Sequence, residues 1–507
     1  MLAVIVAIVR WERAMIGLLR HCAARLVAFV NNTTISKPYF STFFEGGIHS
    51  LLFFYPKRNW WFFIKMRYLS FFFEFFFLFS FAFAFDFDVT SDDSINSALT
   101  TVTDGMLNYY QSTSHTFTAY WWMTGAGLNS MTDTYAATGN TTHLDMLISA
   151  LVANKGDNND YAPNSEKFDL GNDDQGIWGL SAMSAAEVNM TTGDSSASFT
   201  ELAQAVFNEI MSRWDTSSCG GGVRWQIYSF NNGYSYKNSI SNGILFQLAA
   251  RLARYTNNDT YVDLAQKVWD WSTTVGFVDL DDYTVYDGAS VTSNCSSITN
   301  EQWSYNVGVY LAGTAFLYNY TNGSSVWQTH MEGLMNKALD YYFTSDKIIY
   351  EPSCEPTESC NSDQTAFKGM LARFLGYTMQ LAPYTVETIL PYIQSSAEAA
   401  ALACSGGSDG VTCGYMWYWN NGTWDDHYGL GEQISAVETF QALLAQQSAT
   451  ILTLDTGASS ESNPDAGTDD GDTVTITPAT KSDKGWAGFL TFAFSFVFLL
   501  FSIWLYF

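Results

Sequence analysis

The chain has 507 residues, a formal net charge of −27 and 17% aromatic residues. We expect no nucleic-acid partner, because a phosphate backbone requires clustered lysine and arginine side chains. Strong acidity combined with many aromatic residues is compatible with an extracellular protein that handles uncharged polymers. It is equally compatible with any acidic secreted protein.

The N-terminal region contains a predicted secretory signal peptide at residues 66–84. Met66-Arg67 precedes an apolar run, and Ala82-Phe83-Ala84 forms a small-residue cleavage pattern, so Ala84 would be the last residue removed. A membrane span is the alternative, but the run is short for one. Residues 1–65 have no domain pattern, and we interpret them as an over-extended gene prediction or a dispensable leader.

The C-terminal region has the three parts of a signal for a glycosylphosphatidylinositol (GPI) anchor. Small residues at 469–472 are followed by a polar spacer up to Lys484 and an apolar tail at 485–507. We expect attachment between Asp465 and Asp472; a true tail anchor is the alternative. Residues 451–484 are rich in Ser, Thr and Asp, which is typical of a disordered, O-glycosylated stalk. These features predict a protein at the outer face of the plasma membrane and in the cell wall.

The cysteines and glycosylation sequons also indicate secretion. Beyond residue 84 there are six cysteines, an even number that predicts disulfides. Short loops favour the pairs Cys354–Cys360 and Cys404–Cys413, which leaves Cys219–Cys295. Seven Asn-x-Ser/Thr sequons predict N-glycosylation, at Asn140, Asn189, Asn258, Asn294, Asn319, Asn322 and Asn421.

Residues 85–450 are expected to form an all-α domain. Apolar spacing and helix breakers predict twelve helices, at 92–110, 118–137, 141–154, 173–190, 197–213, 238–255, 259–276, 301–319, 324–344, 363–382, 386–402 and 431–447. Similar turns, such as Thr138-Gly139-Asn140 and Thr256-Asn257-Asn258, precede alternate helices. Six stacked hairpins can close into an (α/α)6 barrel; an open solenoid is the alternative, but polar capping repeats are missing.

Long loops rich in Gly, Asn and aromatic residues separate the predicted hairpins, at 155–172, 214–237, 277–300, 345–362 and 403–430. Because they fall at alternate junctions, we expect them to gather on one rim of the barrel. Long structured loops in a compact domain are often functional.

Asp173 and Asp174 are the candidate catalytic residues. They stand in Gly171-Asn172-Asp173-Asp174-Gln175, between a long loop and a predicted helix. Either they cap that helix, or they form the two carboxyl groups that glycosidic bond cleavage needs, about 5–5.5 Å apart in retaining enzymes. We expect the carboxylate nearer the helix dipole to be ionised and the other to have a raised pKa.

Other residues of the loops are candidates for binding sugars. Aromatic rings can stack on the apolar faces of sugar rings, and the candidates are Trp122, Trp225, Tyr305 and Trp419. Lys237-Asn238 either donates hydrogen bonds to substrate hydroxyls or caps a helix. Asp425-Asp426-His427 either binds sugar hydroxyls or a metal, or forms a loop turn, the interpretation that we favour. We expect no cofactor and assign no metal site.

Several motifs resemble glycoside hydrolase family 76, the α-1,6-mannanases. They are the aspartate motif, Gly221-Gly222-Val223-Arg224-Trp225, Lys237 to Gly243, Trp303 to Val309, and Cys360-Asn361-Ser362-Asp363-Gln364 with Phe367-Lys368-Gly369. The resemblance spans residues 93–447 and implies an (α/α)6 barrel with Asp173 as the nucleophile and Asp174 as the general acid/base. It also implies that Lys237 and Asn238 lie in the substrate groove.

The signal peptide and GPI signal resemble the fungal cell-wall branch of this family. That resemblance implies α-1,6-linked mannose glycans, in mannan or the GPI core, as substrates, and either water or a wall glucan hydroxyl as the acceptor. The alternative is a non-catalytic carbohydrate-binding wall protein on the same barrel. A third possibility, a barrel enzyme for anionic sugars, is disfavoured by the low basic content.

Overall fold

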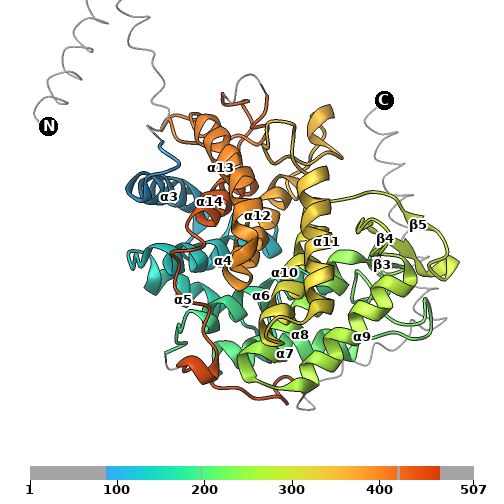
Figure 1. Ribbon diagram of the computed structural model, residues 1–507. Helices are drawn as coiled ribbons and strands as arrows, with labels where there is room; N and C mark the ends of the chain where they lie inside the picture. The colour runs from blue at the N-terminus through green and yellow to red at the C-terminus, as the bar shows by residue number, and fades with distance from the viewer. Residues whose placement is uncertain (1–86, 194, 196, 420–422, 469–507) are drawn as a thin grey trace, which may run out of the picture. The chain divides into compact units, whose positions relative to one another are not determined.

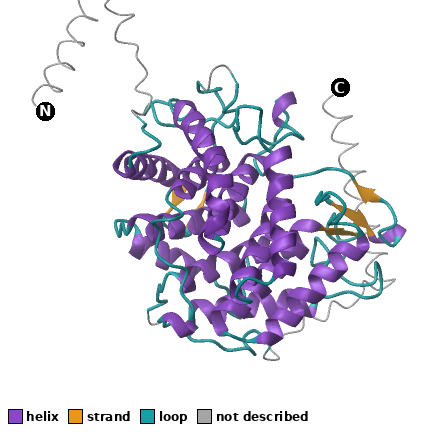
Figure 2. Ribbon diagram, in the orientation of Figure 1, coloured by secondary structure: helices purple, strands orange, loops and turns teal. Residues whose placement is uncertain are grey.

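The computed structural model describes residues 87–193, 195, 197–419 and 423–468, and these residues are mostly helical (Figure 2). The predicted leader, signal peptide, anchor signal and Asn421 lie outside this range. The helices of the described part are α3 (Asp92–Met106), α4 (Trp121–Thr138), α5 (Leu144–Ala153), α6 (Asn172–Glu187), α7 (Phe199–Ser212), α8 (Ser239–Thr256), α9 (Asp259–Val275), α10 (Ser304–Tyr320), α11 (Ser325–Tyr341), α12 (Phe367–Leu381), α13 (Val386–Ala403) and α14 (Leu430–Leu443).

The helices form two concentric rings. The inner helices α4, α6, α8, α10, α12 and α14 contact one another in this order, and α14 contacts α4, which closes the ring. The outer helices α3, α5, α7, α9, α11 and α13 surround them (Figure 1). The predicted (α/α)6 barrel is confirmed, and each of the twelve predicted helices corresponds to one in the structure.

Burial distinguishes the two rings. The inner helix α6 is buried nearly all round, from Gln175 to Glu187. The outer helix α9 buries one stripe, in which Tyr261, Ala265, Val268 and Ser272 recur every three to four residues. A helix with one apolar stripe packs against a core, whereas a helix buried on every side lies inside it.

The long loops lead into the N-termini of the inner helices and therefore gather at one end of the barrel, as predicted. They comprise residues 154–171, 213–235, 276–303, 342–366 and 404–429, and we call this end the mouth. Short antiparallel strands lie in the loops: β1 (Tyr110–Gln111) pairs with β2 (Thr116–Phe117), and β3 (Tyr236–Asn238), β4 (Gly288–Ser290) and β5 (Ile298–Thr299) form a sheet.

The disulfides of the described residues all belong to the mouth loops. Cys219–Cys295 joins two of the loops, and Cys354–Cys360 and Cys404–Cys413 each lie within one loop. The predicted pairing is confirmed. Such cross-links reduce the conformational freedom of long loops.

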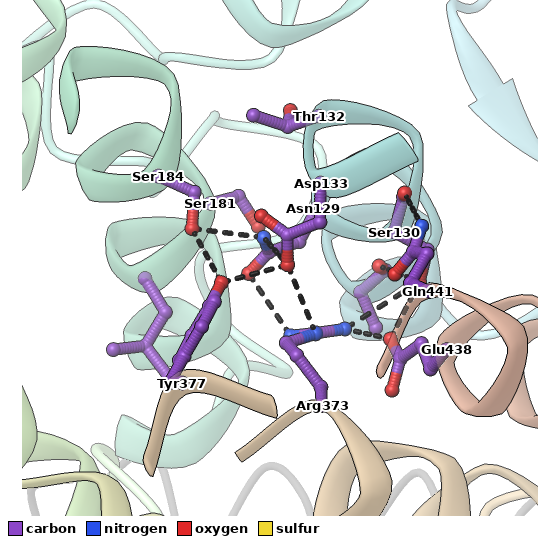
Figure 3. A network of polar contacts seen from close by, with 12 residues as sticks. Asn129, Ser130, Thr132, Asp133, Ser181, Ser184, Arg373, Tyr377, Glu438 and Gln441 are labelled. Atoms are coloured by element: carbon purple, nitrogen blue, oxygen red, sulfur yellow. Dashed lines mark hydrogen bonds and ion pairs between the residues drawn. The ribbon is translucent and has the colours of Figure 1, made fainter. Parts of the chain in front are cut away.

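The opposite end, which we call the closed end, contains a buried network of charged side chains (Figure 3). Arg373 pairs with Glu438 and lies 3.5 Å from the Asp133 carboxylate, which also accepts a hydrogen bond from Tyr377 at 2.7 Å. The network adjoins a cavity of about 40 Å³, lined in part by Asp133, Arg373 and Tyr377. A cavity of this size has room for water molecules.

Residues 451–468 pack against the closed end and the flank of α7, and we call them the strap (Figure 1, red). The Leu452 N–H donates to the Glu187 carbonyl, and Thr200 donates to the buried Ser460 hydroxyl. Further along, Asn208 donates to the carbonyls of Pro464 and Ala466. The prediction of a disordered stalk from residue 451 is therefore wrong for this part, because these hydrogen bonds fix its backbone.

In the part of the chain that the structure describes, no helix combines the length and the apolar character needed to cross a bilayer.

Candidate active site

Asp173 and Asp174 lie at the mouth, in the first turn of the inner helix α6. The preceding loop is fixed by hydrogen bonding of the Asn172 N–H to the Trp225 carbonyl, at 2.8 Å. The Asp174 carboxylate accepts the Gly171 N–H at 2.7 Å, as in a helix cap. Both side chains remain partly exposed. The local sequence therefore gives a helix start whose two acids are still accessible from the mouth.

The two carboxyl groups converge on Gly171. A Cβ atom built there would lie 2.2 Å from Asp173 Oδ1 and 3.2 Å from Asp174 Oδ2. Because both distances are short, one oxygen of Asp173 and one oxygen of Asp174 lie close to each other. Any side chain at Gly171 would collide with Asp173. The two carboxyl groups are therefore close together, and position 171 favours glycine.

Burial raises the pKa values of both carboxyl groups. The pKa of Asp173 is well above its usual range because of burial and the neighbouring charge of Asp174, although a hydrogen bond from Trp225 opposes this. Burial raises the pKa of Asp174 to about 7, against the lowering effect of the Gly171 N–H. The expectation of one carboxyl held ionised by the helix start is therefore wrong, because burial outweighs the helix N–H groups.

The described part of the chain places no cation beside this pair. Among the residues that the structure describes, no Lys, Arg or His forms an ion pair with Asp173 or Asp174. Two close carboxyl groups without a cation favour holding one proton between them, because a second negative charge is costly. One acid and one base can thus be present at the same pH.

Three of the predicted aromatic residues lie near the pair. Trp225 is 37% exposed and contacts Asp173, and its ring packs against Gly233, whose φ of +96° favours glycine. Trp122 donates its indole N–H to Asp363 at 2.9 Å. Tyr305 lies within electrostatic range of Asp173 and stacks on Phe367, with ring centroids 3.7 Å apart.

Asp363 is a third carboxylate at the mouth. It belongs to the motif Cys360-Asn361-Ser362-Asp363-Gln364, which by itself indicates no role for this residue. One of its oxygens accepts from Trp122, and its charge raises the pKa of Asp174. Burial also raises the pKa of Asp363 itself. Only the fold brings Asp363 and Asp174, which are 189 positions apart, to the same site.

Lys237 is not a groove residue, contrary to the prediction. Its side chain is fully buried, and its ammonium group donates to the carbonyls of Asp215, Ser218 and Gly221 and pairs with the Asp215 carboxylate. Asn238 caps α8 by accepting the Ser241 N–H, which is the capping alternative. Both residues therefore support the loop before α8 and do not face a substrate.

Trp419 is 47% exposed on the loop before α14. In the same loop, the Asp425 carboxylate accepts the N–H groups of Tyr415, Met416 and His427, so this acidic motif forms a loop turn, as we favoured. In the described part of the chain, no group of three His, Cys, Asp or Glu side chains could hold a metal ion.

Most of the predicted glycosylation sequons lie away from the mouth. Asn140, Asn189, Asn258, Asn319 and Asn322 occupy turns or helix ends at the C-termini of inner helices, at the closed end. Asn294 lies in a mouth loop and accepts the Cys219 N–H. Asn189 accepts two hydrogen bonds from Ser459 of the strap. Their occupancy stays a prediction.

Comparison with known proteins identifies the family. The sequence model described as Glycosyl hydrolase family 76 matches residues 94–455. The chain belongs to glycoside hydrolase family 76. It is 50% identical to a putative mannan endo-1,6-alpha-mannosidase of Schizosaccharomyces pombe, over 74% of this chain and 86% of the relative. It is 44% identical to mannan endo-1,6-alpha-mannosidase DFG5 of Candida albicans, over 83% of this chain and 94% of the relative.

Solved structures of family 76 share the fold. Dfg5 from Chaetomium thermophilum, solved with glucosamine, has a TM-score of 0.72 and 34% identity, and the match covers 75% of this chain and 97% of that one. An inactive variant of the α-1,6-mannanase GH76A of Salegentibacter sp. HEL1_6, with two consecutive aspartates replaced, was solved with α-1,6-mannotriose. Its TM-score is 0.57 at 18% identity, and the match covers 69% of this chain and 99% of that one.

Proposed function

We propose that this family 76 glycoside hydrolase is a retaining endo-α-1,6-mannosidase, acting on mannan or on the mannose core of GPI glycans. The carboxyl pair Asp173 and Asp174 carries the proposal. The two groups are close together and partly accessible at the mouth of the barrel, and no described Lys, Arg or His forms an ion pair with them. The close relatives named as mannan endo-1,6-alpha-mannosidases support the choice of linkage.

In the first step, Asp174 gives its proton to the leaving glycosidic oxygen while Asp173 attacks the anomeric carbon. The carbon–oxygen bond to the leaving sugar breaks, and a mannosyl ester forms on Asp173. In the second step, Asp174 takes a proton from the acceptor hydroxyl. The acceptor oxygen attacks the same carbon and releases Asp173.

The raised pKa of Asp174, about 7, lets this group carry a proton near neutral pH; the pKa of Asp173 is raised as well, so the assignment of the two roles rests on the resemblance to family 76. A general acid must be protonated near the working pH, and burial provides this condition. The rings of Trp122, Trp225 and Tyr305 border the pair and are suited to bind the apolar faces of mannose.

The acceptor decides the biological outcome. With water, the reaction is hydrolysis of mannan; with a hydroxyl of wall glucan, it is transfer of a mannosylated, GPI-anchored protein to the wall. We propose the second outcome as the role in cell-wall biogenesis. The predicted signal peptide at 66–84 and anchor signal after Asp465 support a GPI-anchored location at the outer face of the plasma membrane.

Incubation of the purified protein with α-1,6-linked mannose oligosaccharides tests the activity. We expect shorter products that are first released as the α-anomer, observed by proton NMR spectroscopy. Release of the β-anomer would contradict the retaining mechanism. Adding a glucan oligosaccharide tests transfer by mass spectrometry, and detection of free reducing ends alone would exclude it.

A further inference from the structure

Three aromatic side chains form a partly exposed cluster on two neighbouring mouth loops. Phe168 precedes α6, and Tyr228 and Phe230 precede α8. The ring centroids of Phe168 and Tyr228 are 5.5 Å apart, and those of Tyr228 and Phe230 are 5.3 Å apart with ring planes only 10° from parallel. We call these three residues the aromatic shelf. No role was assigned to it from the sequence or from the reaction.

The shelf is held in place although much of it faces solvent. Phe168 is 45% exposed and Phe230 is 61% exposed. The Asn231 amide donates to the Phe168 carbonyl at 2.7 Å and to Gln226 at 3.2 Å, so it joins the two loops. Exposed aromatic rings on a fixed backbone keep apolar surface in water, and a contiguous patch of this kind is typical of a binding surface.

The shelf continues from the carboxyl pair. Gly171 and Gln226 form a β-bridge between the two loops, and Trp225, which contacts Asp173, precedes Tyr228 by three residues. Three residues span at most about 10 Å of chain. A sugar chain that is bound across Asp173 and Asp174 can therefore extend past Trp225 to the shelf.

The charges near the shelf fit a neutral ligand. Arg213, which is close enough to influence the Tyr228 hydroxyl, forms an ion pair with Glu209 at 2.9 Å. Lys167 lies over the Phe168 ring, at 5.3 Å from its centroid. Arg213 is thus paired and Lys167 is a single cation, so the described residues around the shelf offer no cluster of unpaired cations to a strongly anionic chain.

We propose that the aromatic shelf is a remote sugar-binding subsite, which stacks on hexose rings in the part of a neutral mannose chain that extends beyond the cleaved linkage. The inference rests on the proposed function, because the carboxyl pair defines where the chain is cut. The shelf would make long chains better substrates than short ones. Phe230 and Phe168, the two exposed rings, would contribute most of the stacking surface.

The test compares Phe168→Ala and Phe230→Ala, alone and combined, with the wild-type protein on α-1,6-mannose oligosaccharides of increasing length. We expect kcat/KM for the longest chains to fall by about fivefold to tenfold, mainly through KM. The shortest cleaved chain should change by less than twofold. Tyr384→Ala, at an exposed tyrosine far from the mouth, is the matched control and should change neither value.

A second measurement uses binding instead of turnover. In the protein carrying Asp173→Asn and Asp174→Asn, we expect long oligosaccharides to bind about fivefold to tenfold more weakly after Phe230→Ala, and Phe230→Tyr to restore binding by calorimetry. Equal losses of affinity for short and long oligosaccharides, or no loss, would contradict the proposal that the shelf binds sugar. If the wild-type protein cleaves no α-1,6-mannoside, the proposed function is contradicted. The dependence of binding on oligosaccharide length would still test whether the shelf is a sugar-binding subsite.

Discussion

Two pairs of acids, one at each end of the barrel, differ in whether a cation lies beside them. At the closed end, Glu187 pairs with Arg251 at 2.6 Å and Glu438 pairs with Arg373. At the mouth, Asp173 and Asp174 have no cation, and burial raises both pKa values. A buried acid with a cation contributes to folding, whereas a buried acid without one retains a proton that chemistry can use.

The largest expected effect belongs to the unpaired acids. Asp173→Asn and Asp174→Asn should each lower kcat/KM on α-1,6-mannose oligosaccharides by about 10³-fold, because each removes a catalytic group. The free energy of unfolding should not decrease at pH 7, since a raised pKa in the folded state means that the ionised carboxyl opposes folding there. Urea titrations measure this. Parallel losses of stability and activity would instead indicate that the acids only cap α6.

The paired acids should show the reverse pattern. Arg251→Met leaves Glu187 as an isolated buried charge, and we expect a loss of about 3–5 kcal/mol in the free energy of unfolding. Activity per folded molecule should be unchanged. The double variant Arg251→Met with Glu187→Gln is the control and should recover part of the loss. A variant of Arg251 that is stable but inactive would break the contrast between the two ends.

Asp363 provides a test of how a neighbouring negative charge affects the carboxyl pair at the mouth. Its negative charge raises the pKa of Asp174, so Asp363→Asn should lower that pKa. Activity that requires protonated Asp174 is lost as the pH rises through about 7. In the variant, the alkaline limb of the pH–kcat/KM profile should therefore move to lower pH, by about half a unit to one unit. Asp426→Asn, on the same rim, is the control, and a shift to higher pH would contradict the arrangement.

The smallest expected effect concerns the strap. Ser460→Ala removes a buried hydroxyl that accepts from Thr200 at 2.9 Å, and should lower the free energy of unfolding by about 1 kcal/mol. Glu461→Gln, at an exposed neighbour, should stay within about 0.5 kcal/mol of the wild type. If the two variants behave alike in urea titrations, the strap does not belong to the folded closed end.

The helices could be predicted because their signals are local. Apolar spacing and turn residues are sufficient to place twelve helices, with differences only at the ends; for example, α12 begins at Phe367 because residues 364–366 form a 3-10 turn. Strands of two or three residues, such as β1 and β3, are too short for a periodic pattern.

The site could be predicted in part. Adjacent aspartates at a helix start are visible in the sequence, but the raised pKa of both groups depends on burial by distant loops. Lys237 was misassigned because its three carbonyl acceptors are non-local. The strap has the composition of a disordered segment, and only its contacts with α7 show that it is fixed. Phe168 and Phe230 had no spacing signal that could join them.

The strap also limits the length of free chain between the barrel and its proposed anchor. The last described residues lie beside α7, where Gly467 approaches Ala205. An attachment at 469–472 would leave at most four residues, about 14 Å when fully extended. The barrel would then stay close to the bilayer surface and could not move far into the wall. It would meet the glycans of neighbouring anchored proteins first, and those are the donors that wall assembly would use.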